Sequence, residues 1–481
     1  MDRLAVTICS FFLVVWLLPA NAQPACLSES AEKAFGHIFN LDFENADNVI
    51  ASIGDGSDKI WLCAYSSFVK SLSRYETPNP DFFASQIRQI RQYADKSPVY
   101  LQRISDIYLM KCYAHFLDKS YVSATSAYLK AKQNVEDIVD ADQGSWQARR
   151  FELLRLAVDA QMQKVLPILA DDKTAGQRAD EYGRCVARLL ADEAVPTLFK
   201  NEIKSVSLLL LPLVCSPEKA GCAMLDSFGA DWPYGSATAS YVAVAQLESA
   251  GQSALALKVL RKADSLGYNK LLNLLNLKYG CQLLNAGNDS CSVFLNQFIE
   301  CQANQTNILY AKMKLAWHFF LNGDTVKAES LCGKIIQSPA TTPNDFQAKY
   351  ECSLFDEWNA RLIRARLLFD AGFYDECISS LVSVQTESLT PIQANEYAYR
   401  MGRACHKLKK YAEAKEYYQK AIDRRFENIH YYPCYSAFYM GTIYSDEGNS
   451  AEAEKYFRMC QKMDSPIYGD EIHQKAKNAM K

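Results

Sequence analysis

The feature that most constrains this chain is a set of small residues that recurs at regular intervals through its second half. Six units begin at Ala237, Asn273, Leu309, Trp358, Asn395 and Cys434, with spacings of 36, 36, 49, 37 and 39 residues. Their eighth positions hold Val244, Gly280, Ala316, Ala365, Gly402 and Gly441, and their twentieth positions hold Ala256, Ser292, Ala328, Cys377, Ala414 and Ala453. Five of the six units place a glycine at the fifteenth position: Gly251, Gly287, Gly323, Gly372 and Gly448. The pattern predicts a helix, a tight turn and a second helix that crosses the first closely.

This register resembles the tetratricopeptide repeat, whose unit carries small residues at positions eight and twenty and an aromatic residue at position twenty-four. Tyr418 and Phe457 meet the last requirement. The resemblance implies an all-α fold, a right-handed superhelical solenoid of antiparallel helix pairs. It is strongest in the last two units and weakest in the unit at Asn273, where Asn296 replaces the expected large apolar residue. The extra residues of the 49-residue spacing include Pro339 and Pro343 and are interpreted as a loop.

The amino-terminal half carries the same landmarks less regularly. A unit beginning at Leu27 gives Ala34, Ala46 and Ile50, and one beginning at Ser105 gives Cys112, Ala124, Tyr128 and Ala131. Residues 146–213 have the periodicity of amphipathic helices without repeat landmarks. We therefore predict a signal peptide at 1–22, a helical region with divergent repeats at 23–214, a linker at 215–236, a repeat array at 237–469 and a capping helix at 470–481. Ile472, Ala476 and Ala479 are the predicted inward side of that last helix.

The first 22 residues have the pattern of an export signal. Arg3 precedes a mainly apolar run from Leu4 to Leu18, and small residues at Ala20 and Ala22 fit a cleavage site. The run is shorter than the roughly 20 residues that span a bilayer, which disfavours the alternative of a membrane anchor. We expect a periplasmic or cell-envelope protein, with contact to a membrane only if Cys26 is lipidated.

The sequence holds 16 cysteines, many of them at positions that the repeat register places in the interior. Small buried side chains are the simplest interpretation of Cys112, Cys332, Cys377, Cys405 and Cys460, with a reactive thiol as the alternative. Cys291 and Cys301 are predicted to share one helix, too far apart to bond, whereas Cys215 and Cys222 flank a loop that could bring them together. Because no cluster has zinc-ligand spacing, we expect no metal and no cofactor.

Charge and motifs argue against two broad functions. The 52 basic and 55 acidic residues nearly cancel, which gives no reason to expect nucleic-acid binding. The sequence lacks HExxH, GxSxG, a P-loop and GxGxxG, and its six histidines show no ligand spacing. We therefore expect that the protein is not an enzyme.

The resemblance also indicates an interaction surface, because in this family the second, fifth, ninth and twelfth positions of the first helix face a concave groove. These positions are Tyr310, Met313, Trp317 and Phe320, then Glu396, Tyr399, Arg403 and His406, then Tyr435, Phe438, Thr442 and Ser445. The predicted partner-binding residues are Tyr310, Trp317, Tyr399, Arg403, His406, Tyr435 and Phe438. For Trp317 and Phe320, packing against neighbouring repeats is an equal alternative.

The resulting hypothesis is a non-catalytic exported scaffold that binds a protein or peptide in this groove. The set of Lys, Asn and Arg residues with which some family members hold a peptide carboxylate is missing. The alternative function is a cell-surface carbohydrate-binding protein, with Trp232, Trp317 and Trp358 as platforms for sugar rings.

Overall fold

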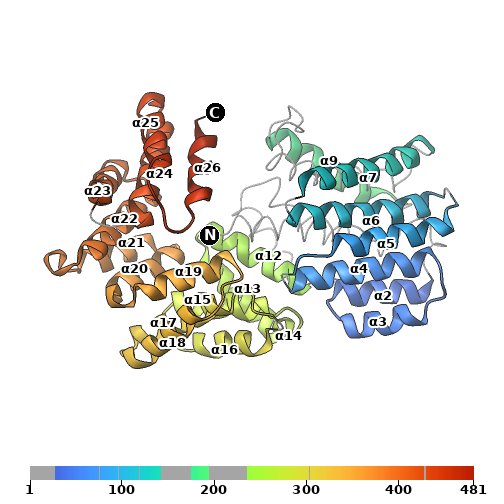
Figure 1. Cartoon of the computed structure of the whole chain (residues 1–481), viewed down its shortest axis with the longest axis horizontal. Helices are drawn as coiled ribbons and strands as arrows, with labels where there is room; N and C mark the ends of the chain where they lie inside the picture. The colour runs from blue at the N-terminus through green and yellow to red at the C-terminus, as the bar shows by residue number, and fades with distance from the viewer. Residues whose placement is uncertain are drawn as a thin grey trace. The chain divides into compact units, whose positions relative to one another are not determined.

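The computed structural model describes residues 28–74, 76–95, 97–118, 120–141, 175–193, 236–302, 304–426 and 430–480. Its regular structure in these ranges is helical throughout (Figure 1). The chain divides into two compact units, Met1–Ala250 with Lys258–Leu275 and Gly251–Leu257 with Asn276–Lys481. The predicted linker at 215–236 and the Cys215–Cys222 pair lie outside the described residues, apart from Ser236, the first residue of a helix.

The first unit contains consecutive helix pairs. Its helices are α2 (Glu29–Phe39), α3 (Phe43–Ser52), α4 (Ser57–Ser73), α5 (Pro80–Ile90), α6 (Pro98–Leu117), α7 (Tyr121–Ala141), α9 (Ala175–Ala191), α12 (Ser236–Ser249) and α14 (Tyr268–Leu271), with a 3₁₀ turn at Arg91–Tyr93. The predicted units at Leu27 and Ser105 are the packed pairs α2/α3 and α6/α7, and Ala34, Ala46 and Ala124 are buried there. Between them lies a further pair, α4/α5, which the register did not reveal.

Helix α13 (Ser253–Ser265) is divided between the units, and so is α15 (Leu274–Asn285) at its start. The second unit continues in chain order, drawn from yellow to red in Figure 1. Its helices are α16 (Cys291–Cys301), α17 (Ile308–Leu321), α18 (Thr325–Gln337), α19 (Pro343–Ser353), α20 (Ala360–Asp370), α21 (Tyr374–Val382), α22 (Pro391–Lys407), α23 (Tyr411–Asp423), α24 (Tyr431–Asp446), α25 (Ser450–Gln461) and α26 (Gly469–Ala479), with 3₁₀ turns at Phe355–Glu357, Thr386–Ser388 and Arg424–Phe426. Each predicted repeat begins with two successive helices, and the helical structure confirms the predicted fold class.

The small residues at position eight sit where the two helices of a pair cross. A Cβ atom added to Gly402 would lie 2.6 Å from the ring of Tyr418, and one added to Gly441 would lie 2.7 Å from the ring of Phe457. Both aromatic rings come from position twenty-four and are buried. In the unit at Asn273, Leu295 contacts Gly280 in the same way, one residue before the exposed Asn296. The unit that looked weakest in sequence therefore packs like the others.

The predicted turn glycines also adopt the conformation that requires them. All five have φ between 70° and 84°, the left-handed region in which a side chain is strained. In the remaining unit the fifteenth residue is Lys409, which adopts φ 60° without being glycine. The turn geometry is therefore common to all six units.

One expectation from the sequence is wrong: the extra residues of the 49-residue spacing are not simply a loop. They include α19, because the Thr342 hydroxyl accepts the backbone N–H of Asp345 as an N-cap and Pro343 stands in the first turn. Proline is well tolerated there, since the first-turn N–H groups have no partner within the helix. The helix α19 packs against both α17 and α18.

The cysteine predictions that fall on described residues are confirmed. Cys112, Cys332, Cys377, Cys405 and Cys460 are buried, and Cys291 and Cys301 are the two ends of α16.

The capping helix α26 buries Ile472 and Ala476, as predicted. Ala479 is exposed rather than inward-facing. It lies in the last turn, beyond the residues that pack on α24 and α25.

The crossing glycines give a direct test of the packing. Gly441→Ala should lower the free energy of unfolding by about 2 kcal/mol, because its methyl group has no room beside Phe457. The matched control is Gly333→Ala in α18, where no atom lies within 4 Å of the added Cβ; it should raise stability by about 0.5–1 kcal/mol. Urea unfolding followed by circular dichroism measures both changes, and equal effects of the two substitutions would contradict the packing.

Candidate functional site

The predicted binding residues lie on the first helix of three predicted repeats in the second unit. Tyr310 and Trp317 lie on α17, Tyr399, Arg403 and His406 on α22, and Tyr435 and Phe438 on α24. The helices α20, α22 and α24 pack on one another in sequence, so residues on these three can form one continuous surface. The surroundings of the predicted residues differ: Trp317 and Tyr399 are buried, and the others are half-buried.

Trp317 is 1% exposed and belongs to the core. Lys314 Nζ lies 4.1 Å from its ring centroid and the Arg366 guanidinium lies 4.7 Å from it, while the Trp358 ring meets it edge-on at 6.4 Å. The packing alternative therefore describes this residue.

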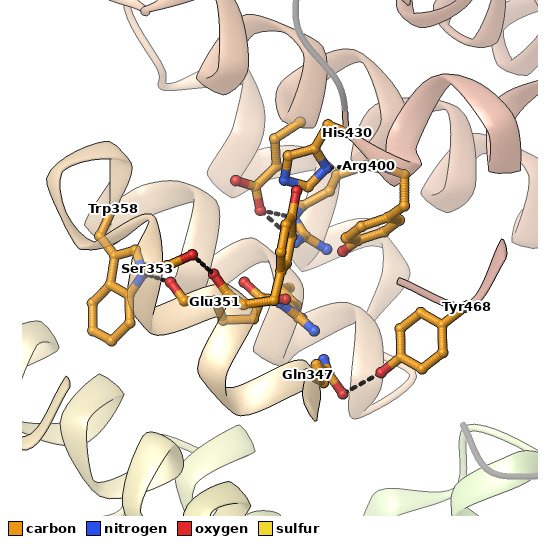
Figure 2. A network of polar contacts seen from close by, with 11 residues as sticks. Gln347, Glu351, Ser353, Trp358, Arg400, His430 and Tyr468 are labelled. Atoms are coloured by element: carbon orange, nitrogen blue, oxygen red, sulfur yellow. Dashed lines mark hydrogen bonds and ion pairs between the residues drawn. The ribbon is translucent and has the colours of Figure 1, made fainter. Parts of the chain in front are cut away.

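Trp358 is half-buried and donates its indole N–H to the backbone oxygen of Glu351 (3.0 Å; Figure 2). Trp232 lies outside the described residues, so no described tryptophan offers specific support for the carbohydrate alternative.

Arg403 occupies the most unusual position among the predicted residues. Its guanidinium lies 4.7 Å from the ring centroid of Phe369 and 4.2 Å from that of Tyr439, and its Nη1 donates to the hydroxyl of Tyr399 at 2.9 Å. Among the described residues it forms no ion pair with a carboxylate. We name Phe369, Tyr399, Arg403, Tyr435 and Tyr439 the Arg403 cluster; it draws on α20, α22 and α24.

Within this cluster, exposure differs from residue to residue. Tyr399 is buried, whereas Phe369, Arg403, Tyr435 and Tyr439 are half-buried and retain accessible surface. The rings of Tyr435 and Tyr439 lie 6.3 Å apart on successive turns of α24. The accessible part of the cluster is thus a cation bordered by aromatic rings, the combination enriched in the energetic centres of protein interfaces.

The other predicted residues lie at the edges of this surface. His406 is half-buried, its Nδ1 lies 3.2 Å from the hydroxyl of Tyr418, and burial lowers its pKa to about 4. The ring of Phe438 packs 5.7 Å from Phe457, and Tyr310 lies beneath the ammonium group of Lys314 at 5.1 Å. Phe438 and Tyr310 are both half-buried. The binding roles of these residues stay predictions.

A polar network that the register did not reveal lies beside these helices (Figure 2). Glu351 of α19 pairs with Arg366 of α20 at 2.6 Å, and Arg400 donates its Nε to Glu396 at 2.6 Å. Gln347 of α19 accepts a hydrogen bond from Tyr468 at 2.5 Å. Burial would raise the pKa of Glu351, but the guanidinium of Arg366 holds that pKa below its usual value. The inserted helix α19 therefore contributes one charged group, Glu351, to its contact with α20.

The remaining member of this network is His430, the N-cap residue of α24. Its Nδ1 accepts the backbone N–H of Tyr431 at 3.0 Å, and its ring stacks on Tyr432 at 3.9 Å and meets Tyr350 at 5.3 Å. Burial lowers its pKa to about 4, although Glu351 opposes the change. Accepting through Nδ1 requires the neutral ring, so protonation would break the cap.

His430 predicts how stability depends on pH. Because its pKa is about 4 when folded and near 6.5 when unfolded, its contribution is complete above pH 6.5 and is lost as pH falls towards 4. His430→Asn keeps an acceptor for the N-cap and removes the titration. Between about pH 7 and pH 5, the wild-type protein should lose about 2 kcal/mol more stability than the variant in urea unfolding. Parallel pH profiles would contradict this assignment.

Within the described ranges, no set of three or more His, Cys, Asp or Glu side chains is arranged to hold a metal ion. In the same ranges, no helix combines the length and the apolar character needed to cross a membrane.

In a comparison with known proteins, one family model matches the last two repeats. Residues 394–465 match the family model described as tetratricopeptide repeat, and this match covers α22 to α25. None of the curated protein sequences matches the chain. A solved structure titled "Crystal structure of APC/C hetero-tetramer Cut9-Hcn1" aligns over 99% of both chains at 10% identity with a TM-score of 0.25, which is too low to carry an argument. The region from α22 to α25, which contains most of the Arg403 cluster, is thus similar to tetratricopeptide repeats.

Proposed function

We propose that this protein is a non-catalytic scaffold that binds a segment of another protein through the Arg403 cluster. One observation carries the proposal: a half-buried guanidinium lies between two aromatic rings and has no carboxylate partner among the described residues. Proteins with tetratricopeptide repeats commonly act by binding other proteins, which supports this reading of the site.

The chemistry of Arg403 indicates what it would contact. A guanidinium carries five N–H groups, and among the described residues a single hydrogen bond, to Tyr399, uses one of them. The flanking rings hold its plane in place, so little side-chain entropy remains to be lost on binding. Backbone carbonyl oxygens or a carboxylate of a bound segment would supply the missing acceptors, while Tyr435 and Tyr439 would contact its apolar parts.

We also propose that the protein is exported, on the pattern of Met1–Ala22 alone. The first 27 residues lie outside the described ranges, so the support is the sequence. An amino terminus at Gln23 in the purified mature protein would support export, and one at Met1 would contradict it. Acylation of Cys26 remains the variant of this proposal that would place the protein on a membrane.

The binding proposal is tested with peptides selected on the wild-type protein from a displayed random library. Arg403→Gln removes the charge at similar size and should weaken the selected peptides at least about tenfold, because a desolvated hydrogen-bonded cation is lost. Tyr435→Ala should weaken them by a similar factor. Titration calorimetry gives the dissociation constants.

The matched control is Arg458→Gln on the exposed face of α25, where the arginine forms a surface ion pair with Glu454. It should leave affinity unchanged. Unfolding curves of all three variants exclude loss of fold as the cause. The proposal is wrong if Arg403→Gln and Arg458→Gln bind the selected peptides equally well, or if the library yields no peptide that binds.

A further inference from the structure

Two cysteines of the last repeat lie close enough to react with each other. Cys434 begins the repeat on α24 and Cys460 lies near the end of α25; both are 0% exposed. Their sulfur atoms are 3.6 Å apart. A disulfide bond is about 2.05 Å long, so the sulfur atoms need to approach by about 1.6 Å, the size of a side-chain adjustment.

The repeat itself does not require cysteine at these two positions. They are the first and twenty-seventh positions of the unit, which hold Asn395 and Ala421 in the preceding repeat and Leu309 and Ile335 in the repeat that begins at Leu309. Leucine with isoleucine, and asparagine with alanine, therefore occupy the same two positions in other repeats. Among the six units, only this one holds cysteine at both the first and the twenty-seventh positions.

A histidine from the capping helix completes the group. His473 of α26 places its Nε2 3.7 Å from the sulfur of Cys434 and 3.0 Å from the backbone oxygen of Met463. A carbonyl oxygen only accepts hydrogen bonds, so Nε2 carries the hydrogen, which it donates to the Met463 oxygen and shares with the sulfur of Cys434 at the longer distance. An N–H group beside a sulfur stabilises the thiolate, which is the reactive form of cysteine.

The acidity of the thiols agrees with this arrangement. A hydrogen bond from Cys460, aided by His473, lowers the pKa of Cys434 despite its burial. Burial instead raises the pKa of Cys112 and of Cys377 to about 12. The pKa of Cys434 is therefore shifted in the opposite direction from the pKa values of Cys112 and Cys377.

We propose that Cys434 and Cys460 form a redox site, oxidised by a hydroperoxide to a reversible disulfide that joins α24 to α25. The site is independent of peptide binding by the Arg403 cluster. Access comes from α26, a helix of 11 residues that packs through Ile472 and Ala476 and carries His473 beside Cys434. Local opening of a helix with so little buried surface requires less free energy than global unfolding, and it uncovers Cys434.

The chemistry balances with a peroxide as the oxidant. The Cys434 thiolate attacks one peroxide oxygen, the O–O bond breaks, and the hydroxide that leaves takes up the proton lost by the thiol and becomes water. The Cys460 sulfur then attacks the sulfenic acid, the S–O bond breaks, and a second water leaves as the S–S bond forms. Two thiols thus supply the two electrons that reduce hydrogen peroxide, and a dithiol such as dithiothreitol reverses the result.

The experiment treats the full chain with hydrogen peroxide, stops the reaction with N-ethylmaleimide under denaturing conditions and maps the peptides by mass spectrometry. We expect a peptide pair joined through Cys434 and Cys460 that disappears after dithiothreitol. His473→Asn should slow its formation about tenfold without changing the final yield, because it removes the donor at the sulfur and leaves both thiols in place. Cys377→Ser, which alters another fully buried thiol, should leave the rate unchanged.

Three results would overturn the proposal. They are the absence of this linked pair while other thiols become oxidised, formation of the pair at the same rate in His473→Asn, and a linkage that dithiothreitol does not reverse. The peptide map of the wild-type protein decides the first and third without any variant. An unfolding curve of His473→Asn confirms that its rate refers to the folded protein.

Discussion

The contact between the buried carboxylate of Asp345 and the start of α17 is the interaction on which the position of α19 in the second unit depends. One of its oxygens accepts the backbone N–H groups of Leu309 and Tyr310 at 3.0 and 3.2 Å, and the other accepts that of Asn307 at 3.2 Å. These groups belong to the start of α17, where helical N–H groups have no partner and the helix dipole favours a negative charge. The hydroxyls of Thr341 and Thr342 also donate to this carboxylate. Because Asp345 lies in the first turn of α19, it fixes the inserted helix to the preceding repeat.

The position of α19 then determines the polar contacts next to the candidate site. Its Glu351 neutralises Arg366, its Gln347 meets Tyr468, and its Tyr350 contacts the ring of His430. An unpaired buried charge would be costly, and the two ionised groups among these, Glu351 and Arg366, neutralise each other. Arg403 differs, because aromatic faces and a phenol hydroxyl surround it in place of a carboxylate. This contrast between paired and unpaired cations distinguishes the Arg403 cluster from the structural network beside it.

The sequence predicted the helix pairs well because their contacts are local. Small residues at positions eight and twenty and a ring at position twenty-four meet within one unit of about 36 residues, so their spacing alone reveals the crossing. The fold of α19 escaped prediction because two prolines were interpreted as a loop, although Thr342, Pro343 and Asp345 form a helix start. The unit at Asn273 shows a second limit of the sequence pattern. The residue that packs on Gly280 is Leu295, one position before Asn296, where the pattern expects a large apolar residue.

The candidate site was less predictable, since its contacts cross between repeats. The register identified Arg403 and Tyr435 but could not supply Phe369, which comes from the preceding helix pair, and it could not separate the buried Trp317 from half-buried neighbours. These contacts depend on how neighbouring repeats stack, and the spacing of residues along the chain does not encode that stacking.

Hydrogen exchange of the backbone amides around α19 tests the account most directly. If Asp345 fixes this helix to α17, the amides of Asn307, Leu309 and Tyr310 and those in the hydrogen-bonded part of α19 should exchange slowly in the wild-type protein. Asp345→Ala should release both groups together, while α24 and α25 keep their protection. Rapid exchange of the hydrogen-bonded amides of α19 in the wild-type protein, or slow exchange that persists in Asp345→Ala, would contradict it.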